Sequence, residues 1–513
     1  SYALYALSKE IINVVYYTIP NGVTYIGGAI FSGCNNLSKI EVEEGNSYYD
    51  SRNNCNAIVD ISTNTLNSAC RYTSIPNSVT SIGDGAFSGF EYLNNVTIPN
   101  NVTKIGLSAF ADCTNLNKIT MPNSLTNIGY FAFWNCSSLS EISIPSSVTE
   151  VGKEVFVGTA WYNKQPDGLL YMDGWNLGYK GDSPSGTVNI KEGTIGVAGG
   201  AFDLCDKIAD ISLPSSMKYI CSNAFSRVGV TSLTIPNHVV TIGSSAFEDC
   251  YKLSRITIPS SVTSIGFQAF FRCGLTTVNI PEGVTHIGAQ AFYCCSELAN
   301  INIPASVTTI GSAAFSGTEW LNSQPYGLVY LDNWLLGYNG EKPRGSVVIA
   351  DGTKGIADYS LYYCNGMTSV TIPESITSIG DYAFAYCTSL IGVTSLISEP
   401  FTIDENVFQY NDQSDMFTPA TLYVPKGTKG KYGSISGWNK FTTILETGES
   451  LQPKGDVNGD NVVDVADIAA IISVMAGDAT LGSVAHYADV NGDGTVDVAD
   501  IATIISEMAA SAR

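Results

Sequence analysis

The sequence predicts a solenoid of short parallel β-strands with 3₁₀ or short helical turns, followed by a small helical domain. Two observations predict this fold class. A unit of 22 or 23 residues recurs about fourteen times between Phe31 and Phe408. A twelve-residue acidic loop then occurs twice, 33 residues apart, and each copy leads into an apolar-faced helix. We therefore divide the chain into a solenoid at residues 1–446, a linker at 447–454 and a C-terminal domain at 455–513.

Residues 93–113 show how one unit of the repeat is expected to fold. Apolar residues alternate from Leu93 to Ile98 as a short strand, a second strand runs from Val102 to Ile105, and a tight turn surrounds Phe110. Each unit has one narrow apolar edge, which only stacking in register at about 4.8 Å can bury. The repeat thus predicts one continuous core and, for fourteen rungs, a solenoid on the order of 70 Å long.

The repeat is interrupted at three places. Residues 46–72 form an irregular unit rich in Asn and Tyr, and residues 422–444 break the pattern as a capping element should. Two further inserts share one pattern at an offset of 159 residues, so the middle of the solenoid is itself duplicated. The first insert contains Trp161, Gln165, Pro166, Tyr171, Asp173, Trp175 and Tyr179, and the second contains Trp320, Gln324, Pro325, Tyr330, Asp332, Trp334 and Tyr338.

The thirteen cysteines follow the repeat more than they suggest a disulfide framework. Nine of them lie three residues after a repeated Phe or, once, Leu. A cysteine that recurs at one repeat position is expected to be a small buried apolar residue. Stacked side chains point the same way, which is poor geometry for a bridge. A bridge between Cys55 and Cys70, which fall outside the rule, is left open.

Composition and charge exclude some classes of partner. The 25 basic and 47 acidic residues give a net charge of −22, so nucleic acid and anionic lipid are disfavoured. No apolar run reaches the roughly 18–20 residues of a membrane span. Ser1 is not an initiator Met and no signal segment precedes it, which indicates a mature or trimmed product.

The repeat resembles a known family. The unit L-x-x-I-x-I-P-x-x-V-T-x-I-G-x-x-A-F-x-x-C looks like the BspA-like leucine-rich repeats of surface proteins from oral and gut anaerobic bacteria, over roughly residues 11–445. The resemblance implies a leucine-rich-repeat solenoid that is exported to the cell surface. It also implies adhesion to host matrix proteins, host cells or other bacteria.

The C-terminal acidic loops predict two calcium sites. Calcium takes six to eight hard oxygen ligands, and carboxylates alternating along a tight loop supply them from one side. In the usual order of such loops, position 7 contributes its backbone carbonyl. Chance similarity is a poor alternative, because two copies occur in phase and each precedes a helix. The expected ligands are Asp456, Asn458, Asp460, Val462, Asp464 and Asp467 in the first loop, and Asp489, Asn491, Asp493, Thr495, Asp497 and Asp500 in the second.

The whole C-terminal domain resembles a type I dockerin, a small helical domain with two EF-hand-like loops. Asp instead of Glu at position 12 and the lack of a full entering helix both match dockerins. The resemblance implies docking to a cohesin module through the residues at positions 10 and 11, which are Val465, Ala466, Val498 and Ala499. These pairs are identical in the two copies, so binding in two orientations is conceivable. They depart from the Ser-Thr pair of the best-known dockerins.

Catalytic constellations are weak. Three histidines support little acid–base chemistry, and an acid pair such as Asp173 with Glu154 is indicated by no motif. The chain is therefore expected not to be an enzyme. The tryptophans of the two inserts, Trp161, Trp175, Trp320 and Trp334, are candidate ligand-binding residues, and the alternative is that they only pin a hairpin onto the solenoid.

The leading hypothesis is an exported bacterial adhesion or scaffold protein. Its solenoid would bind a host or microbial macromolecule, and its calcium-loaded C-terminal domain would dock to a cohesin-like partner. The alternative is a non-catalytic, glycan-binding accessory of an extracellular polysaccharide-degrading complex.

Overall fold

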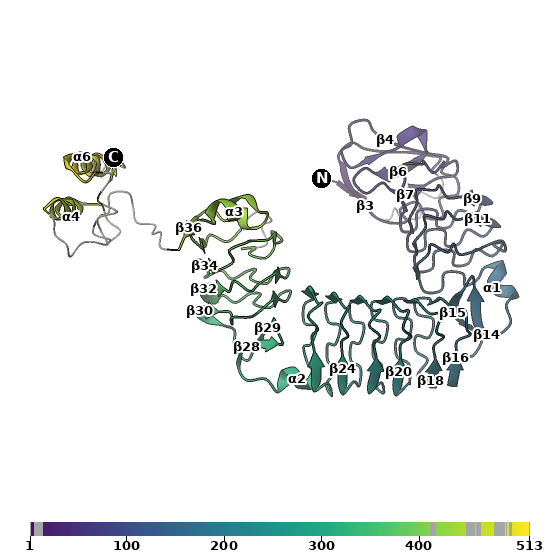
Figure 1. Cartoon of the computed structure of the whole chain (residues 1–513). Coiled ribbons are helices and arrows are strands. Elements are labelled where there is room, and N and C mark those ends of the chain that lie inside the picture. Colours follow the sequence, from purple (N-terminus) through teal and green to yellow (C-terminus); the bar gives the residue numbers. More distant parts are fainter. Residues whose placement is uncertain are drawn as a thin grey trace.

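The computed structural model describes residues 2–4, 14–410 and 417–447 and, in the C-terminal domain, residues 457, 463–476, 488, 490–491 and 495–511. The predicted solenoid is confirmed (Figure 1), with about 18 turns instead of fourteen. The count by Phe positions is low because the hairpin turns and the C-terminal cap lack the repeated Phe.

Most rungs contribute two short strands, and each strand pairs in parallel with the same strand of a neighbouring rung. The V-T-x-I strands are β8 (Ser81–Ile82), β10 (Lys104–Ile105), β12 (Asn127–Ile128), β13 (Glu150–Val151), β17 (Gly196–Val197), β19 (Tyr219–Ile220), β21 (Thr241–Ile242), β23 (Ser264–Ile265), β25 (His286–Ile287), β27 (Thr309–Ile310), β31 (Gly355–Ile356) and β33 (Ser378–Ile379).

The second line consists of the strands at the position that precedes the repeated Pro in most rungs. They are β9 (Asn95–Thr97), β11 (Lys118–Thr120), β16 (Gly186–Asn189), β18 (Ile208–Ser212), β20 (Ser232–Thr234), β22 (Arg255–Thr257), β24 (Thr277–Asn279), β26 (Asn300–Asn302), β30 (Arg344–Val348), β32 (Gly366–Ile372), β34 (Gly392–Ser395), β35 (Thr421–Val424) and β36 (Ile444–Glu446). At the N-terminal end, β1 (Tyr2–Leu4) pairs with β3 (Val23–Ile26), and β2 (Tyr16–Ile19) pairs with β4 (Lys39–Val42).

The repeated Phe and Cys side chains form ladders in the core. Neighbouring Phe rings stack, as Phe247 does on Phe270 with centroids 5.3 Å apart and planes 2° apart. The Cys thiol of a rung donates to the Phe carbonyl of the preceding rung, as Cys136 Sγ does to Phe110 O at 3.0 Å. All thirteen cysteines are free thiols, Cys55 and Cys70 included. Burial raises the pKa of Cys221 and of Cys295 to about 12, so these thiols stay protonated at neutral pH.

Two hairpins divide the solenoid into three segments. The first follows α1 (Ala160–Lys164) and consists of β14 (Gly168–Met172) and β15 (Trp175–Lys180). The second follows α2 (Glu319–Asn322) and consists of β28 (Gly327–Leu331) and β29 (Trp334–Asn339). We name residues 159–182 the first corner and residues 318–341 the second corner, because the stack changes direction at each of them (Figure 1).

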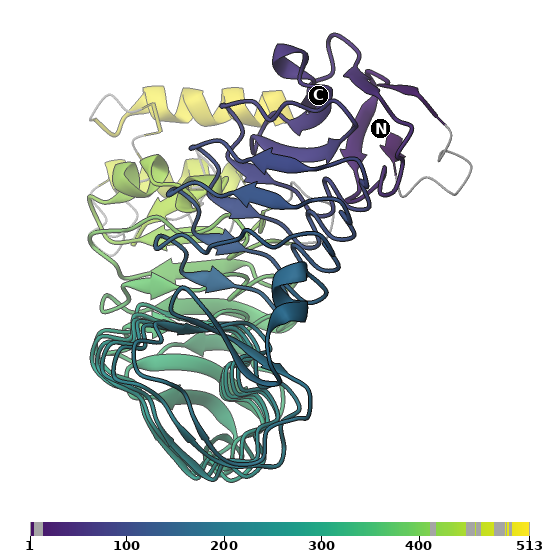
Figure 2. The ribbon, with the colours of Figure 1, turned by 90° about the vertical axis from the view of Figure 1, so that its right-hand side faces the viewer.

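The direction changes because each hairpin ends one sheet and begins another. β15 pairs in parallel with β17 on one side but antiparallel with β14 on the other, so β13 becomes a sheet edge. β28 and β29 repeat this topology with β31. The expected continuous rod is therefore wrong: an N-terminal arm, a middle segment and a C-terminal arm have separate core clusters. Figure 2 looks along the middle segment, whose rungs superimpose.

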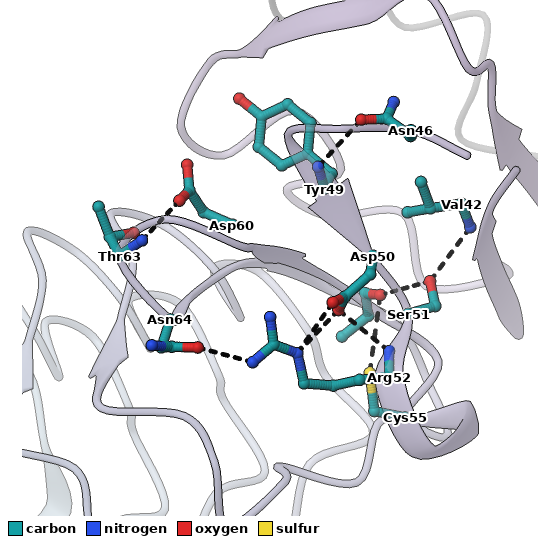
Figure 3. A network of polar contacts seen from close by, with 11 residues as sticks. Val42, Asn46, Tyr49, Asp50, Ser51, Arg52, Cys55, Asp60, Thr63 and Asn64 are labelled. Atoms are coloured by element: carbon teal, nitrogen blue, oxygen red, sulfur yellow. Dashed lines mark hydrogen bonds and ion pairs between the residues drawn. The ribbon is translucent and has the colours of Figure 1, made fainter. Parts of the chain in front are cut away.

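The irregular unit at residues 46–72 has the same hairpin topology. β6 (Ala57–Asp60) and β7 (Thr65–Ala69) are antiparallel, and β7 pairs in parallel with β8. β5 (Tyr49–Asp50) and the 3₁₀ turn η2 (Arg52–Asn54) precede them. Arg52 joins the hairpin together, with Nε 2.8 Å from Asp50 Oδ1 and Nη1 2.7 Å from Asn64 Oδ1 (Figure 3). The many polar residues of this unit therefore hold the hairpin.

The C-terminal cap seals the last rung with aromatic side chains. α3 (Lys429–Ser434) and the 3₁₀ turn η3 (Trp438–Lys440) bury Tyr432 and Trp438 completely. Tyr432 OH donates to Ile397 O at 2.8 Å, and Trp438 Nε1 donates to Phe401 O at 2.9 Å. Burial with satisfied polar atoms is what an end cap of an open core requires.

Candidate calcium loops and corner cavities

Each acidic loop of the C-terminal domain is closed by a buried carboxylate at its twelfth position. Asp467 lies at the start of α4 (Val465–Met475) and Asp500 at the start of α6 (Val498–Ser511), and both are fully buried. Asp467 Oδ1 accepts from Val457 N at 2.6 Å, and its Oδ2 accepts from Asp464 N at 2.8 Å. Each carboxylate therefore reaches back across its loop.

The second loop has a similar arrangement. Asp500 accepts from Asn491 N at 3.0 Å and from Asp497 N at 2.8 Å. Asp464 and Asp497 each cap their helix by accepting from the N–H two residues on, at 2.7 Å. A buried carboxylate among further acids calls for a cation, and these hard oxygens fit calcium.

The remaining predicted ligands are not all within the described residues. Thr495 is described and lies at an exposed position in the second loop, next to Val496. Asp456, Asn458, Asp460, Val462, Asp489 and Asp493 lie outside the described residues.

The two helices of the domain divide their apolar residues between a core and a surface. Ile471 and Ile504 are buried between α4 and α6, with Ile468 and Ile501 partly buried beside them. The apolar face of each helix is not buried as a whole, because Ile472, Met475 and Ile505 are exposed.

The predicted partner-binding residues lie on the exposed side. Val465 is 69% exposed and Val498 67% exposed, and Ala466 and Ala499 beside them are exposed too. Seven residues on, Ile472 and Ile505 are each 53% exposed, which places them two turns along the same helix face. Both copies thus carry the same exposed apolar surface.

The two corners of the solenoid share a set of hydrogen bonds. Thr159 Oγ1 donates to Phe156 O at 2.7 Å and accepts from Tyr162 N, and Thr318 makes the same pair of bonds. The turn carboxylate of each hairpin accepts a backbone N–H of the preceding rung: Asp173 from Ile144 at 2.8 Å, and Asp332 from Ile303 at 2.7 Å. These bonds join each hairpin to the rung before it.

Each corner also buries a tryptophan. Trp175 is 0% exposed and Trp334 4% exposed. A Cβ at the paired residue, Gly196 or Gly355, would lie 2.5 or 2.4 Å from the indole ring. These glycines are thus required by the close approach of a ring. Trp161 and Trp320 are partly buried against the neighbouring core clusters. Trp175 and Trp334 thus pack inside the solenoid, whereas Trp161 and Trp320 keep part of their rings exposed.

The first corner has a cavity of ≈ 440 Å³ with a mixed lining. Aromatic side chains of Trp161, Tyr162 and Tyr179 line it together with Lys153 and Asp203. Lys153 Nζ lies 2.9 Å from Asp203 Oδ2, so the charges of these two lining residues neutralise each other.

The second corner has a cavity of ≈ 210 Å³ with different chemistry. Ser312 stands at the place of Lys153, and Asp358 and Tyr359 stand where the first corner has Gly199 and Gly200. Burial raises the pKa of Asp358 to about 6. Ser360, also in the lining, is buried, and its Oγ has no hydrogen-bond partner within the described residues.

Asp358 and the tyrosines beside it are not among the residues predicted from the sequence. Their signal is a departure from the repeat: the two positions around A-F-x-x-C that hold varied residues elsewhere are tyrosines in residues 359–386. The two acids considered as a catalytic pair have different environments. Glu154 lines the first cavity, whereas Asp173 accepts a backbone N–H. His286 is exposed and bonds through Nδ1 to Thr309 Oγ1 at 2.6 Å.

Comparison with known proteins finds matches in both parts of the chain. Residues 5–72, 59–164, 182–266, 218–327 and 341–424 match the family described as BspA type leucine rich repeat region, in 6 copies. Residues 454–509 match the type I dockerin domain. Comparison with curated proteins gives no match.

Several solved structures are similar to this chain. One is a leucine-rich repeat protein from Bacteroides ovatus, 23% identical over 72% of this chain and 87% of that one, with a TM-score of 0.31. Another, from Eubacterium ventriosum, is 24% identical over 52% of this chain and 61% of that one, with a TM-score of 0.28. A leucine rich cell surface protein from Faecalibacterium prausnitzii is 22% identical over 80% and 96%, with a TM-score of 0.25.

Proposed function

We propose that this chain, which belongs to the BspA-type leucine-rich repeat family and ends in a type I dockerin domain, is a non-catalytic extracellular binding protein. The dockerin would attach it to a cohesin-bearing partner, and the solenoid would bind a host or microbial macromolecule. We place the solenoid at residues 1–446, the linker at 447–454 and the dockerin at 455–513. No helix among the described residues is long and apolar enough to cross a membrane.

The observation that carries the docking proposal is the duplicated exposed surface of Val465, Ala466, Val498 and Ala499. Exposed apolar side chains next to a metal site are unusual in so small a domain, because burying them would stabilise it. Dockerin domains bind calcium, and two ions would satisfy the buried carboxylates of the loops. Calcium would then hold both exposed surfaces in shape without touching the partner.

The docking proposal is tested with a panel of cohesin modules and the calcium-loaded full chain. We expect Val465→Asp or Val498→Asp alone to leave binding by the other copy, and the double variant to lose it. Val348→Asp, at a 65% exposed valine of the solenoid, is the matched control. Equal binding by the double variant and the wild type would exclude this surface.

Calcium removal is tested on residues 453–513, which carry ten acidic and two basic residues. Without calcium the ligands of each loop repel one another and about sixty residues bury little core, so the helices are expected to be lost. Circular dichroism with and without a chelator measures this, and unchanged helicity would contradict it.

The second candidate function is that of a glycan-binding accessory of a polysaccharide-degrading complex. The observation that favours it is the first corner cavity, in which aromatic side chains stand next to acidic groups. Arrays of glycans and of matrix proteins separate the two functions: binding to glycans alone supports the accessory, and binding to proteins supports adhesion.

A further inference from the structure

Five tyrosines form one surface cluster on the C-terminal arm, next to the second corner. The rings of Tyr359 and Tyr382 stack with centroids 4.9 Å apart, and Tyr362 lies 5.1 Å from Tyr359 and 5.2 Å from Tyr386. Tyr363 lies 6.2 Å from Tyr386. Tyr359 is 41% exposed and Tyr363 47% exposed, so the cluster presents ring surface to solvent.

The fold does not require tyrosine at these positions. Tyr359, Tyr363, Tyr382 and Tyr386 all have φ between 55° and 61°. This left-handed conformation favours Gly and Asn and costs free energy for a bulky side chain. The equivalent positions of other rungs hold varied residues in the same conformation, for example Gly85, Asn135, Phe131, Gln268 and Arg272. The repeat thus leaves the choice of side chain free here, and four tyrosines in two successive rungs are a local concentration of aromatic surface that the repeat does not explain.

A row of carboxylates runs beside the cluster. Asp358, Asp381 and Asp404 occupy the same position in successive rungs, 23 residues apart. None of them makes an ion pair within the described residues. Burial raises the pKa of Asp381, and the neighbouring Asp404 raises it further. The row thus lacks a neutralising cation.

The second corner cavity includes one member of the carboxylate row and one member of the tyrosine cluster. Asp358, Tyr359 and Ser360 all line it, and the buried Ser360 Oγ has no partner among the described residues. In the first corner, Lys153 supplies a cation from within the chain, whereas Ser312 holds the equivalent place here. The second cavity therefore has an acid and a hydroxyl but no cation.

The cluster already binds one cation of its own chain. Lys342 Nζ lies 4.7 Å from the centroid of the Tyr363 ring and donates to Tyr363 O at 3.1 Å. A cationic side chain over a tyrosine face gains from the ring quadrupole. A neutral sugar could stack on the same rings, but it would leave the charge of the three carboxylates unneutralised.

We propose that the second corner and the tyrosine cluster bind lysine or arginine side chains from a basic segment of a partner protein. One cationic side chain would enter the cavity beside Asp358 and Ser360, and others would lie over Tyr359 and Tyr363. The net charge of −14 on residues 1–452, which is −22 minus the −8 of residues 453–513, attracts such a segment. This inference rests on the proposed function in that it takes the solenoid to be the ligand-binding part.

The test uses the calcium-loaded full chain and a fluorescent peptide of alternating arginine and glycine, with a glutamine-for-arginine peptide as the uncharged probe. Anisotropy should show saturable, one-to-one binding of the arginine peptide alone. Asp358→Asn should weaken it roughly tenfold, because a charge-assisted contact is lost. Tyr363→Ser should weaken it about threefold or more.

Two variants serve as matched controls, and a third places a competing cation in the cavity. Glu297→Gln in the middle segment removes the same charge as Asp358→Asn, and Tyr72→Ser removes an exposed tyrosine of the N-terminal arm; both should leave binding unchanged. Ser312→Lys should weaken binding as Asp358→Asn does, because it supplies the cation that Lys153 supplies at the first corner. Circular dichroism and thermal unfolding verify that each variant is folded.

Several outcomes would overturn the proposal. Equal weakening by Glu297→Gln and Asp358→Asn would show general electrostatic attraction, and binding of neutral oligosaccharides that Tyr363→Ser abolishes would show a sugar site. If added calcium displaced the peptide from the wild type but not from Asp358→Asn, the cavity would be a metal site instead. The arrays separate this inference from the proposed function. If they give a solenoid ligand that the site variants bind as the wild type does, only this inference is excluded. If they give no ligand for the solenoid, the proposed function is excluded.

Discussion

The first and second corners have one skeleton and two linings. Both use a threonine helix cap, a turn carboxylate bonded to the preceding rung, and a tryptophan buried over a glycine. Their cavities differ: the first holds the Lys153–Asp203 ion pair, and the second has Asp358 and Tyr359 without a cation. The shared hydrogen bonds and buried tryptophans produce the change of direction, and the differing cavity linings are available for binding.

The largest expected effect tests the shared skeleton. Trp175→Ala and Trp334→Ala should each lower the free energy of unfolding by about 3–5 kcal/mol, because each removes a buried indole. Chemical denaturation measures this. Trp134→Ala, at a partly exposed ring, is the control and should change it much less. A corner variant that stays as stable as the wild type but loses a ligand would instead assign its tryptophan to binding.

The glycines beneath the rings give the next effect. Gly196→Ala and Gly355→Ala place a Cβ about 2.5 Å from the indole, and overpacking of this kind costs about 1–3 kcal/mol. The double variant Gly196→Ala with Trp175→Leu should lose less free energy of unfolding than the two single variants lose in sum, because the smaller side chain leaves room for the Cβ. Strict additivity in the denaturation midpoints would contradict direct contact between the two residues.

The threonine caps test whether the same hydrogen bonds contribute equally to stability at the two corners. Thr159→Ala and Thr318→Ala should each destabilise the chain by about 1–2 kcal/mol, because each removes a helix cap with two hydrogen bonds. Thr159→Ser and Thr318→Ser keep the hydroxyl and should restore most of the loss. Clearly different losses at the two corners would break the comparison.

The smallest effect separates the corners by pH. The pKa of Asp358 is about 6 in the folded chain, above its ordinary value of 3.8, so the folded state holds this proton more tightly than the unfolded state. Its contribution is most favourable at low pH and declines as pH rises through the window from about 4 to 6. Asp358→Asn should therefore stabilise the chain at pH 7 by on the order of 1 kcal/mol, with allowance for solvent screening.

This pH effect is measured by thermal unfolding between pH 4 and 7. Asp203→Asn, which breaks the ion pair with Lys153 at the first corner, is the contrasting variant and should destabilise the chain at pH 7. Stabilisation by both variants would contradict the assignment of a cation to one corner and not to the other.

Much of the fold could be predicted because the repeat places equivalent residues at a constant separation. Phe247 meets Phe270 and Cys136 meets Phe110 through the same rung-to-rung relation, so one unit describes the others. The bends could not be predicted in this way. They depend on Gly199 N bonding to Val151 O across 48 residues and on Ser378 Oγ bonding to Thr308 O across 70, contacts that skip the hairpins.

Among the site predictions, too, those that depend on local spacing could be made from the sequence and those that depend on packing could not. The two acidic loops follow from ligand spacing alone, since the chemistry of calcium is local to twelve residues. Which apolar residues of the following helices face outward did not follow, because Ile471 and Ile472 are adjacent and equally apolar. Only the packing of α4 on α6 buries the first and leaves the second exposed.

By itself the sequence determined the rung, its ladders and the position of the calcium loops, because each depends on neighbours at a fixed spacing along the chain. Tertiary structure alone decided that the stack turns at two hairpins, that Trp175 and Trp334 are buried there, and that, among the described residues, a lysine lines the first corner cavity and none lines the second. The physical reason is that a short strand is specified by its own residues, whereas its partners on either side are set by how whole segments pack.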